Sequence, residues 1–338
     1  MILPPLIGTS PAIVQARELV RRFAPSRLSI LLLAPTGSGK DLLARHIHAA
    51  SQRPGPLVPV NCANLPSAMA DSLLFGHRRG AFSGAVETRR GHVMRAHAGT
   101  LFLDELLSLP SDVQPKLLRT LDSGEVQPLD ADAAEHVDLR VVVAAQDGIG
   151  EALCEGTLRG DLYHRVAGVT IRVPPLSQRR EDIGPLAAYF AGLEGRELEE
   201  GALPVLLGHP WPGNVRELRD TIIRAGGLVE NGTLPPAALA EAIDLGAPPG
   251  ADSIDAVRLV DAERRRVLDA CAAHGWNADR AAAVLGMSRT TLWRRLQALG
   301  VSLQREKALF QRFAMLLKHP ATMEESPGVE PAQVVARQ

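Results

Sequence analysis

The segment APTGSGKD, residues 34–41, has the residue types of a phosphate-binding loop. Gly37 and Gly39 allow the backbone N–H groups to curl around phosphate oxygens, and Lys40 can reach the terminal phosphates. An apolar run precedes the segment and the helix-like stretch LLARHIHAA follows it, which is the strand, loop and helix context that such a loop requires. The residues expected to contact a nucleotide here are Thr36, Gly37, Ser38, Gly39, Lys40 and Asp41.

Two positions depart from the usual loop pattern. Ala34 stands where the pattern has its first glycine, and Asp41 replaces the Ser or Thr whose hydroxyl contacts magnesium. Taken alone, the segment is also compatible with a simple glycine turn between a strand and a helix. A second motif has to decide between these two interpretations.

The stretch LFLDE, residues 101–105, is that second motif. It is typical of a buried strand ending in two carboxylates, which would emerge at the carboxyl edge of a parallel sheet near the glycine loop. Asp104 is placed to hold magnesium, and Glu105 to orient and deprotonate an attacking water. A lone Asp-Glu pair after a strand favours a helix N-cap, but together with the glycine loop it predicts a nucleoside triphosphatase.

From Leu6 to about Val173, short apolar runs alternate with amphipathic helical stretches. These are the elements that must position the groups described above. This alternation predicts an α/β fold with a mainly parallel sheet covered by helices. The expected strands are Leu28–Leu33, Leu57–Asn61, Thr100–Asp104, Leu139–Ala145 and Val169–Val173. Short helices broken by PWPGN, residues 210–214, follow and predict a small helical subdomain.

Composition and turn formers divide the chain further. The expected parts are a nucleotide-binding α/β subdomain at residues 1–175, a helical lid subdomain at 176–243, a linker at 244–256, an all-α helix-turn-helix domain at 257–302, and a helix with a disordered tail at 303–338. The linker assignment depends on APPGA, residues 247–251, which is rich in turn formers.

The bulk composition narrows the class of protein. The 338 residues are 46% hydrophobic, enough for two or three domains, and the formal net charge of -1 means that any nucleic-acid contact needs a local basic face. Three widely spaced cysteines fit a reduced compartment better than a disulfide framework or a zinc site. The longest apolar run, SILLLAP, is too short to span a bilayer. We therefore expect a cytoplasmic protein without membrane insertion.

The stretch NADRAAAVLGMSRTTLWRRLQALG, residues 277–300, is typical of two helices joined by a turn at Gly286. Ser288 is expected to cap the second helix, which carries arginines and threonines able to contact phosphates and base edges. The candidate DNA-binding residues are Ser288, Arg289, Thr290, Thr291, Arg294 and Arg295. A solvated basic helix in a three-helix bundle is the alternative. The preceding stretch Val257–Ala273 is the candidate dimer surface.

The segment GHRRGAFSGA, residues 76–85, places Phe82 among glycines and small residues. No apolar companions recur at a helical or strand period, so a core position for this side chain is disfavoured. The pattern predicts an exposed hairpin tip whose glycines let it rise and fold down, with Phe82 offering apolar area to a partner. The alternative is a hairpin tip that tucks Phe82 into its own domain.

Taken together, the motifs resemble the AAA+ domain of bacterial sigma-54-dependent transcriptional activators, also called enhancer-binding proteins. The resemblance covers Leu6 to Val301 and depends on the joint order of LIGTSPA, TGSGKDLLARHIH, VNCANL, FGHRRGAFSGA, GTLFLDE, QPKLLR, LRGDLYHRV, PWPGNVREL and a Fis-type helix-turn-helix. It implies that the surface loop Gly80, Ala81, Phe82, Ser83, Gly84 and Ala85 contacts sigma-54, with Ser83 where the family has threonine.

The resemblance also implies roles for residues outside the two first motifs. Arg159 and Arg165 match the arginines that reach the nucleotide of a neighbouring subunit, and Arg216 matches a sensor arginine. Asn61 matches the asparagine that holds the catalytic glutamate away from water. Gln146, after Ala145, replaces the family's usual Asn in the sensor strand and is expected to contact phosphate or water. The implied catalytic residues are Glu105, Asp104, Lys40, Arg159, Arg165 and Asn61.

The implied function is an activator that binds enhancer DNA as dimers, forms a ring up to a hexamer, and uses Mg²⁺ and ATP to remodel sigma-54 RNA polymerase holoenzyme. No regulatory domain is expected before Leu6, so control would come from a separate protein, from expression level or from the tail. Two alternatives stay open. One is a DNA-binding regulator with a degenerate, non-hydrolysing site, suggested by Ala34, Ala145 and Gln146. The other is an AAA+ machine of the chaperone or magnesium-chelatase kind, which would lack the Phe82 loop and the arginine-bearing helix.

Overall fold

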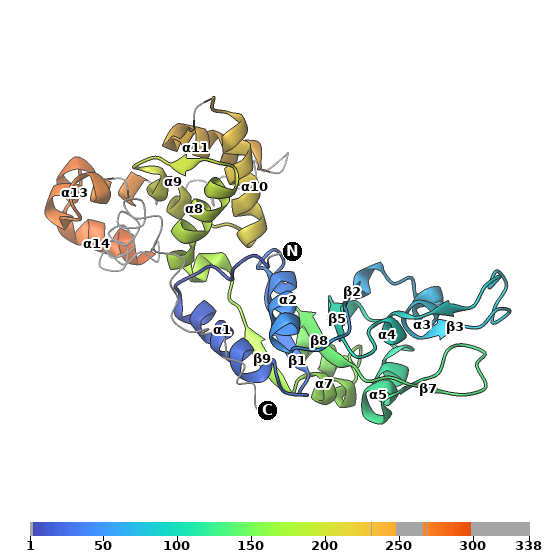
Figure 1. Ribbon diagram of the computed structural model, residues 1–338. Helices are drawn as coiled ribbons and strands as arrows, with labels where there is room; N and C mark the ends of the chain where they lie inside the picture. Colours follow the sequence, from blue (N-terminus) through green and yellow to red (C-terminus); the bar gives the residue numbers. More distant parts are fainter. Residues whose placement is uncertain (1–2, 231, 248–265, 269, 299–338) are drawn as a thin grey trace, which may run out of the picture. The chain divides into compact units, whose positions relative to one another are not determined.

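The computed structural model describes residues 3–230, 232–247, 266–268 and 270–298 (Figure 1). These residues form two compact units. One unit joins the chain up to Leu186 with Pro210–Asp220, and the other joins Ala187–His209 with the chain from Thr221 on. The glycine loop and both carboxylates of the LFLDE motif therefore belong to the first unit.

A five-stranded sheet is the centre of the first unit. Every neighbouring pair of strands is parallel. The order across the sheet is β2 (Leu57–Asn61), β5 (Thr100–Asp104), β8 (Arg140–Ala145), β1 (Ile30–Leu33) and β9 (Val169–Arg172). The predicted α/β fold is confirmed, and each expected strand is present with its ends shifted by at most two residues.

Both faces of the sheet are buried, which explains why the strands are apolar throughout. Successive side chains point to opposite faces, so Leu31, Leu101 and Leu103 enter one core cluster while Ile30 and Phe102 enter the other. The second cluster is completed by helices α1 (Pro11–Phe23) and α2 (Lys40–Ala50), and the first by α3 (Ser67–Phe75), α5 (Gln114–Ser123) and α7 (Gly160–Val166). Helices thus cover both faces (Figure 1).

The remaining elements of the first unit are short. They include α4 (His92–Arg95), α6 (Ile149–Cys154), the antiparallel pair β3 (Gly76–His77) and β4 (Arg89–Arg90), and the antiparallel pair β6 (Glu125–Val126) and β7 (Glu135–His136). Single 3-10 turns occupy Cys62–Asn64, Leu106–Ser108, Leu176–Gln178 and Arg180–Asp182.

The second unit is helical. It contains α9 (Ala202–Gly208), α11 (Pro236–Leu245), the parallel pair β10 (Glu197–Leu198) and β11 (Thr233–Leu234), and the ends of α8 (Ile183–Leu193) and α10 (Asn214–Gly227). Further along lie α13 (Ala278–Val284) and α14 (Arg289–Ala298). Within the described ranges, no helix is both long and apolar enough to cross a bilayer.

Buried Asp182 connects the N-terminal segment to the rest of the first unit. Its Oδ1 accepts hydrogen bonds from the N–H groups of Thr9 (2.6 Å) and Ser10 (2.8 Å), and its Oδ2 accepts one from the Ser10 hydroxyl (2.6 Å). Buried Arg179 forms an ion pair with Asp182 (3.5 Å) and donates to the Ser38 carbonyl of the glycine loop (3.3 Å). The LIGTSPA motif is thus linked to the glycine loop through two buried charges.

We expect Asp182→Ala to lower the free energy of unfolding of the first unit by about 3–5 kcal/mol, because Arg179 would stay buried without its carboxylate partner. Urea unfolding followed by the fluorescence of Trp211, which is buried in the same unit, measures this change. The other two tryptophans are removed by Trp276→Phe and Trp293→Phe so that they do not contribute to the signal.

Asp138→Ala is the matched control, since Asp138 is half exposed and forms a surface ion pair with Arg53 (2.9 Å). This substitution should change the free energy of unfolding by about 1 kcal/mol or less. Equal effects of Asp182→Ala and Asp138→Ala would show that the buried pair does not stabilise the unit.

Candidate functional site

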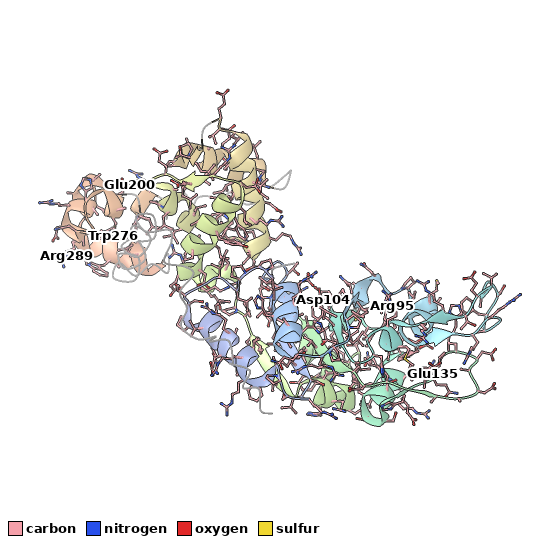
Figure 2. The ribbon with its side chains drawn as sticks, in the orientation of Figure 1. Arg95, Asp104, Glu135, Glu200, Trp276 and Arg289 are labelled. Carbon is pink, nitrogen blue, oxygen red and sulfur yellow. The ribbon has the colours of Figure 1, made fainter. Side chains whose placement is uncertain are left out.

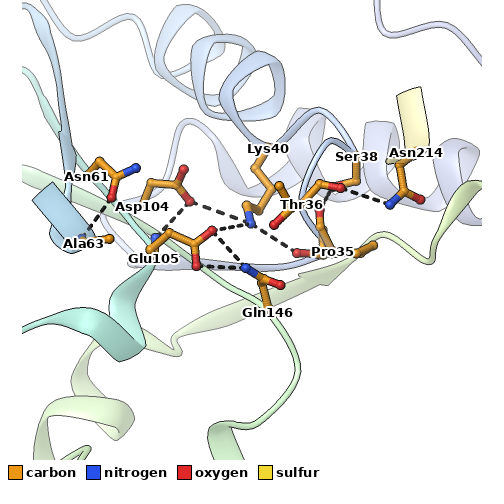
Figure 3. Close-up of polar contacts among 11 residues, drawn as sticks. Pro35, Thr36, Ser38, Lys40, Asn61, Ala63, Asp104, Glu105, Gln146 and Asn214 are labelled. Carbon is orange, nitrogen blue, oxygen red and sulfur yellow. Dashed lines mark hydrogen bonds and ion pairs between the residues drawn. The ribbon is translucent and has the colours of Figure 1, made fainter. Parts of the chain in front are cut away.

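The carboxyl edge of the sheet brings three separate chain segments together (Figure 3). The glycine loop follows β1, Glu105 follows β5, and Gln146 follows β8. β8 lies between β5 and β1 in the sheet. Asp104 is the last residue of β5 at this edge (Figure 2). Because parallel strands end on the same side of a sheet, segments far apart in the sequence meet here.

Lys40 lies at the centre of this meeting point and is 7% exposed. Its Nζ donates to the Ala34 carbonyl (3.3 Å) and lies 3.5 Å from Oε1 of Glu105 and 3.8 Å from Oδ1 of Asp104. A buried ammonium group is costly unless it is paired. The two carboxylates and the loop carbonyl therefore stabilise the buried Lys40 ammonium group.

Asp104 is half-buried beside this cation. Burial is the largest influence on its carboxyl group and raises its pKa, the Lys40 ammonium lowers it, and the Glu105 carboxylate raises it again. The group therefore lies in a polar but incompletely hydrated setting, in which a further positive charge would be favourable.

Glu105 has a left-handed backbone, with φ 53° and ψ 52°. This conformation is strained for a residue other than glycine and is typical of functional positions. The Glu105 N–H donates to Oδ1 of Asp104 (2.9 Å). The Gln146 amide nitrogen donates to both carboxylate oxygens of Glu105, at 3.1 Å and 3.0 Å (Figure 3). The structure thus brings the predicted residues Lys40, Asp104, Glu105 and Gln146 into one hydrogen-bonded cluster.

The glycine loop depends on two left-handed glycines. Gly37 has φ 75° and Gly39 has φ 101°. A Cβ atom on Gly37 would lie 2.2 Å from the Gly213 carbonyl oxygen, so only glycine fits there. Ala34 is not left-handed and is buried, and its N–H donates to the Ala145 carbonyl (3.1 Å) as the strand pairing continues. The departure from glycine at residue 34 is therefore accommodated by the fold.

The PWPGN segment holds the loop from the other side. Buried Asn214 donates to the Thr36 carbonyl (3.0 Å) and accepts a hydrogen bond from the Leu176 N–H (2.8 Å). The Arg216 N–H donates to the Gly37 carbonyl (3.1 Å), which places Arg216 beside the loop with its side chain exposed. Sequence reasoning did not identify Asn214. A PGN turn indicates a left-handed asparagine, here with φ 56°, but not which backbone groups it binds.

Asn61 ends β2 and pairs in register with Asp104. Its side-chain oxygen accepts a hydrogen bond from the Ala63 N–H (2.9 Å) and caps the turn that follows. Among the described residues, the Asn61 side chain makes this one hydrogen bond. The side-chain amide that contacts Glu105 is that of Gln146 (Figure 3).

Arg159 and Arg165 lie at the two ends of α7 and are both exposed. Arg159 pairs with Asp161 (2.8 Å). Arg165 pairs with Asp122 (2.7 Å) and donates to the Leu121 carbonyl. Within the described residues, neither guanidinium contacts the Lys40 cluster, and both pair with local surface groups.

The Phe82 hairpin rises from the β3–β4 pair. Gly80 and Gly84 have φ 90° and φ 105°, and no atom lies within 4 Å of a Cβ added at either position. Phe82 is 40% exposed, and its ring meets the buried His77 ring edge-on, with centroids 5.0 Å apart. Phe82 is therefore accessible to a partner while one edge of its ring packs against the base of the hairpin.

The C-terminal part of the second unit contains the predicted pair of helices, α13 and α14. Ser288 caps α14, because its hydroxyl oxygen accepts a hydrogen bond from the Thr291 N–H (3.1 Å). Leu292 and Leu296 are buried, whereas Arg289 (Figure 2) and Arg294 are exposed. Arg289 also pairs with Asp279 (3.2 Å). The six candidate DNA-binding residues thus lie on one helix and its cap, while Leu299 and most of the candidate dimer helix fall outside the described residues.

Comparison with protein families assigns three parts of the chain. Residues 6–172 match the family described as the sigma-54 interaction domain. Residues 177–254 match the AAA+ ATPase lid domain, and residues 258–299 match the Fis family of bacterial regulatory proteins.

Known proteins are similar to most of this chain. The chain is 36% identical over 311 residues to the Nif-specific regulatory protein of Azotobacter vinelandii, covering 89% of this chain and 60% of that protein. It is 38% identical over 304 residues to the transcriptional regulatory protein ZraR of Klebsiella oxytoca, covering 86% of this chain and 68% of that protein. The solved structure of NtrX from Brucella abortus in complex with ADP is 34% identical, with a TM-score of 0.69, and covers 88% of this chain and 70% of that one. The chain belongs to the family of sigma-54-dependent transcriptional activators, which combine an AAA+ core and lid with a Fis-type helix-turn-helix.

Proposed function

We propose that this protein hydrolyses ATP with Mg²⁺ and uses the energy, in a ring of subunits bound to enhancer DNA, to remodel sigma-54 RNA polymerase at a promoter. The observation that carries the proposal is the cluster at the carboxyl edge of the sheet. There Lys40 Nζ lies 3.5 Å from Glu105 and 3.8 Å from Asp104, directly after a loop with two left-handed glycines.

The glycine loop supports the binding of a triphosphate. Gly37 and Gly39 orient backbone N–H groups toward an anion, and the N-terminus of α2 adds its positive end. Lys40 would then exchange part of its contact with the carboxylates for the terminal phosphates. The related NtrX structures contain ADP or ATP, which agrees with this proposal.

The donor set fits Mg²⁺. Asp104 offers a half-buried carboxylate whose pKa burial raises, so a cation beside it would offset the cost of its ionisation. Mg²⁺ commonly binds through one or two carboxylates together with phosphate oxygens and waters. Held by Asp104, it would neutralise charge on the phosphates during transfer.

Glu105 is the candidate base. It would accept a proton from a water that attacks the terminal phosphorus in line with the leaving oxygen. Its backbone is left-handed, and Lys40 and Gln146 contact its carboxylate oxygens. The degenerate-site alternative depends partly on Ala34, yet the fold accommodates this residue in the strand pairing.

The exposed arginines of α7 are placed where they could contact the nucleotide of a neighbouring subunit. Arg159 and Arg165 are exposed at the ends of α7 and pair only with local carboxylates or carbonyls in the described structure. A guanidinium fixed in this way can exchange a surface partner for the transferring phosphate of an adjacent subunit. Arg216, beside Gly37, is the proposed sensor of the nucleotide within its own subunit.

We expect Glu105→Ala to reduce ATP turnover by about a hundredfold or more, because the proposed base is removed and the neighbouring Asp104 is assigned to Mg²⁺. Binding of a fluorescent ATP analogue should weaken by less than about threefold, since the loop and Lys40 are intact. Phosphate release is measured at concentrations that form rings. Lys40→Ala serves as the control that loses binding, and normal turnover by Glu105→Ala would refute the assigned base.

We expect Phe82→Ala to leave ATP turnover within about twofold and to abolish promoter opening, because the exposed ring is removed while the Lys40 cluster stays intact. Open-complex formation by sigma-54 holoenzyme is scored by permanganate footprinting. Val86→Ala, at a 76% exposed position of the same hairpin, is the matched control and should open promoters normally. Promoter opening by Phe82→Ala would remove this side chain from the proposed contact.

We expect Arg294→Ala to weaken binding to enhancer DNA roughly tenfold and to reduce the slope of log affinity against log salt by about 1, because a phosphate contact is lost. Arg280→Ala, an exposed arginine on α13, is the control with the same change of charge. Equal losses for the two variants would show that binding responds to net charge and not to the surface of α14.

A further inference from the structure

A cavity of about 380 Å³ lies at the base of the Phe82 hairpin and is lined by residues of the β3–β4 and β6–β7 pairs. This volume is in the range of small-molecule sites. Three arginines line it: Arg78, Arg89 and Arg90. We propose that this cavity, called the arginine cavity below, binds a small organic phosphate, with the phosphate group held by the arginines and a nonpolar part on the floor.

The arginine cavity has an excess of positive charge. Residues 76–90 contain four arginines and one glutamate, whereas the whole chain has a formal net charge of -1. Among the described residues, the guanidinium groups of Arg78, Arg89 and Arg90 take part in no hydrogen bond or ion pair. Of the described residues that line the cavity, Glu135 on β7 alone is acidic (Figure 2). A concave site with this balance of charge attracts anions.

The three arginines come from both arms of the hairpin. Arg78 follows β3, while Arg89 and Arg90 form β4 and pair in register with His77 and Gly76. Like charges on adjacent strands repel each other. A phosphate group would relieve this repulsion, because its oxygens accept bidentate hydrogen bonds from guanidinium groups. A bound phosphate would therefore hold the two arms of the hairpin together.

The floor of the arginine cavity is nonpolar and belongs to the core. Phe75 and Val126 line the cavity and are buried members of the first core cluster, and Met94 packs against that cluster. Pro128 adds further nonpolar surface. A bare phosphate ion would leave this surface in contact with water, whereas an aromatic or aliphatic part of a ligand would cover it. The floor and the arginines together favour an organic phosphate over an inorganic ion.

Hydrogen bonds hold the two strand pairs around the cavity. The Arg78 N–H donates to the Leu129 carbonyl (3.0 Å), and the Leu129 N–H donates to the Gly76 carbonyl (2.9 Å). The Thr88 hydroxyl oxygen accepts a hydrogen bond from the Arg79 N–H (3.1 Å) and can still donate its hydrogen to a ligand oxygen. A concave site built in this way suits a small molecule, whereas duplex DNA requires an extended basic face.

The test is a titration of the 338-residue chain with methylumbelliferyl phosphate, which carries a phosphate group on a planar nonpolar ring system. Fluorescence anisotropy of this compound measures its binding. We expect saturable binding that Arg78→Gln and Arg90→Gln each weaken about tenfold, because each variant loses a charge-assisted hydrogen bond. Methylumbelliferone, which lacks the phosphate, should bind about tenfold more weakly. Inorganic phosphate should compete only at about tenfold higher concentration, because it does not cover the floor.

Arg79→Gln is the matched control, since Arg79 is an exposed arginine of the same hairpin that does not line the cavity. This variant should bind within about twofold of the wild-type chain, because solvent and salt screen an exposed charge. Lys40→Ala, which alters the glycine loop, should also bind the compound normally.

Three results would overturn the inference. The first is the absence of saturable binding to the wild-type chain. The second is an equal loss of affinity for Arg79→Gln and Arg90→Gln, which would show a response to net charge alone. The third is a loss of binding for Lys40→Ala but not for Arg78→Gln and Arg90→Gln, which would place the compound in the glycine loop. None of these measurements involves ATP turnover, so the proposed function is tested separately.

Discussion

A buried cation organises the first unit. Lys40 is 7% exposed, so its ammonium group must find negative partners inside the fold. The parallel sheet supplies them because β1 and β5, separated only by β8, end on the same side. Asp104 and Glu105 then lie within 4 Å of Lys40 Nζ. The charges that hold Lys40 in the fold are the ones that a magnesium triphosphate would engage under the proposed function, so its binding would exchange partners without requiring a new arrangement of the sheet.

The backbone around this cation is held by contacts from distant segments. Asn214 and Arg216 donate to carbonyls of the glycine loop, and Arg179 donates to the Ser38 carbonyl. Arg179 in turn pairs with Asp182, which binds the N-terminal segment at Ser10. A loop with left-handed glycines is intrinsically free, so these hydrogen bonds determine which of its conformations is populated.

The same edge of the sheet leads directly to the Phe82 hairpin. Asn61 ends β2, and α3 then runs into β3 at the base of the hairpin. The hairpin is tied to the β6–β7 loop, where the Arg78 N–H donates to the Leu129 carbonyl (3.0 Å). The carboxyl edge of the sheet is therefore connected to the exposed Phe82 ring by a short stretch of chain that includes helix α3. Such a connection provides a physical route for the proposed coupling between nucleotide and partner.

Local sequence determined the elements and most members of the site. Continuous apolar runs such as Thr100–Asp104 are typical of strands buried on both faces, and the glycine loop before an apolar-periodic helix indicated where an anion would bind. Sequence also placed Ser288 as a cap, because capping involves residues only three positions apart. The lack of apolar residues at a regular spacing around Phe82 predicted that this residue is not in a core, and its ring is 40% exposed.

Tertiary structure alone decided which groups touch. The strand order brings Gln146 to Glu105 across 41 residues and Asp182 to Ser10 across 172 residues. No periodicity or spacing encodes such pairs, because they depend on which strands become neighbours and where a strained residue directs its side chain. The family resemblance implied that Asn61 holds the glutamate; in the structure the Asn61 side chain caps a local turn, and the Gln146 amide donates to both oxygens of Glu105.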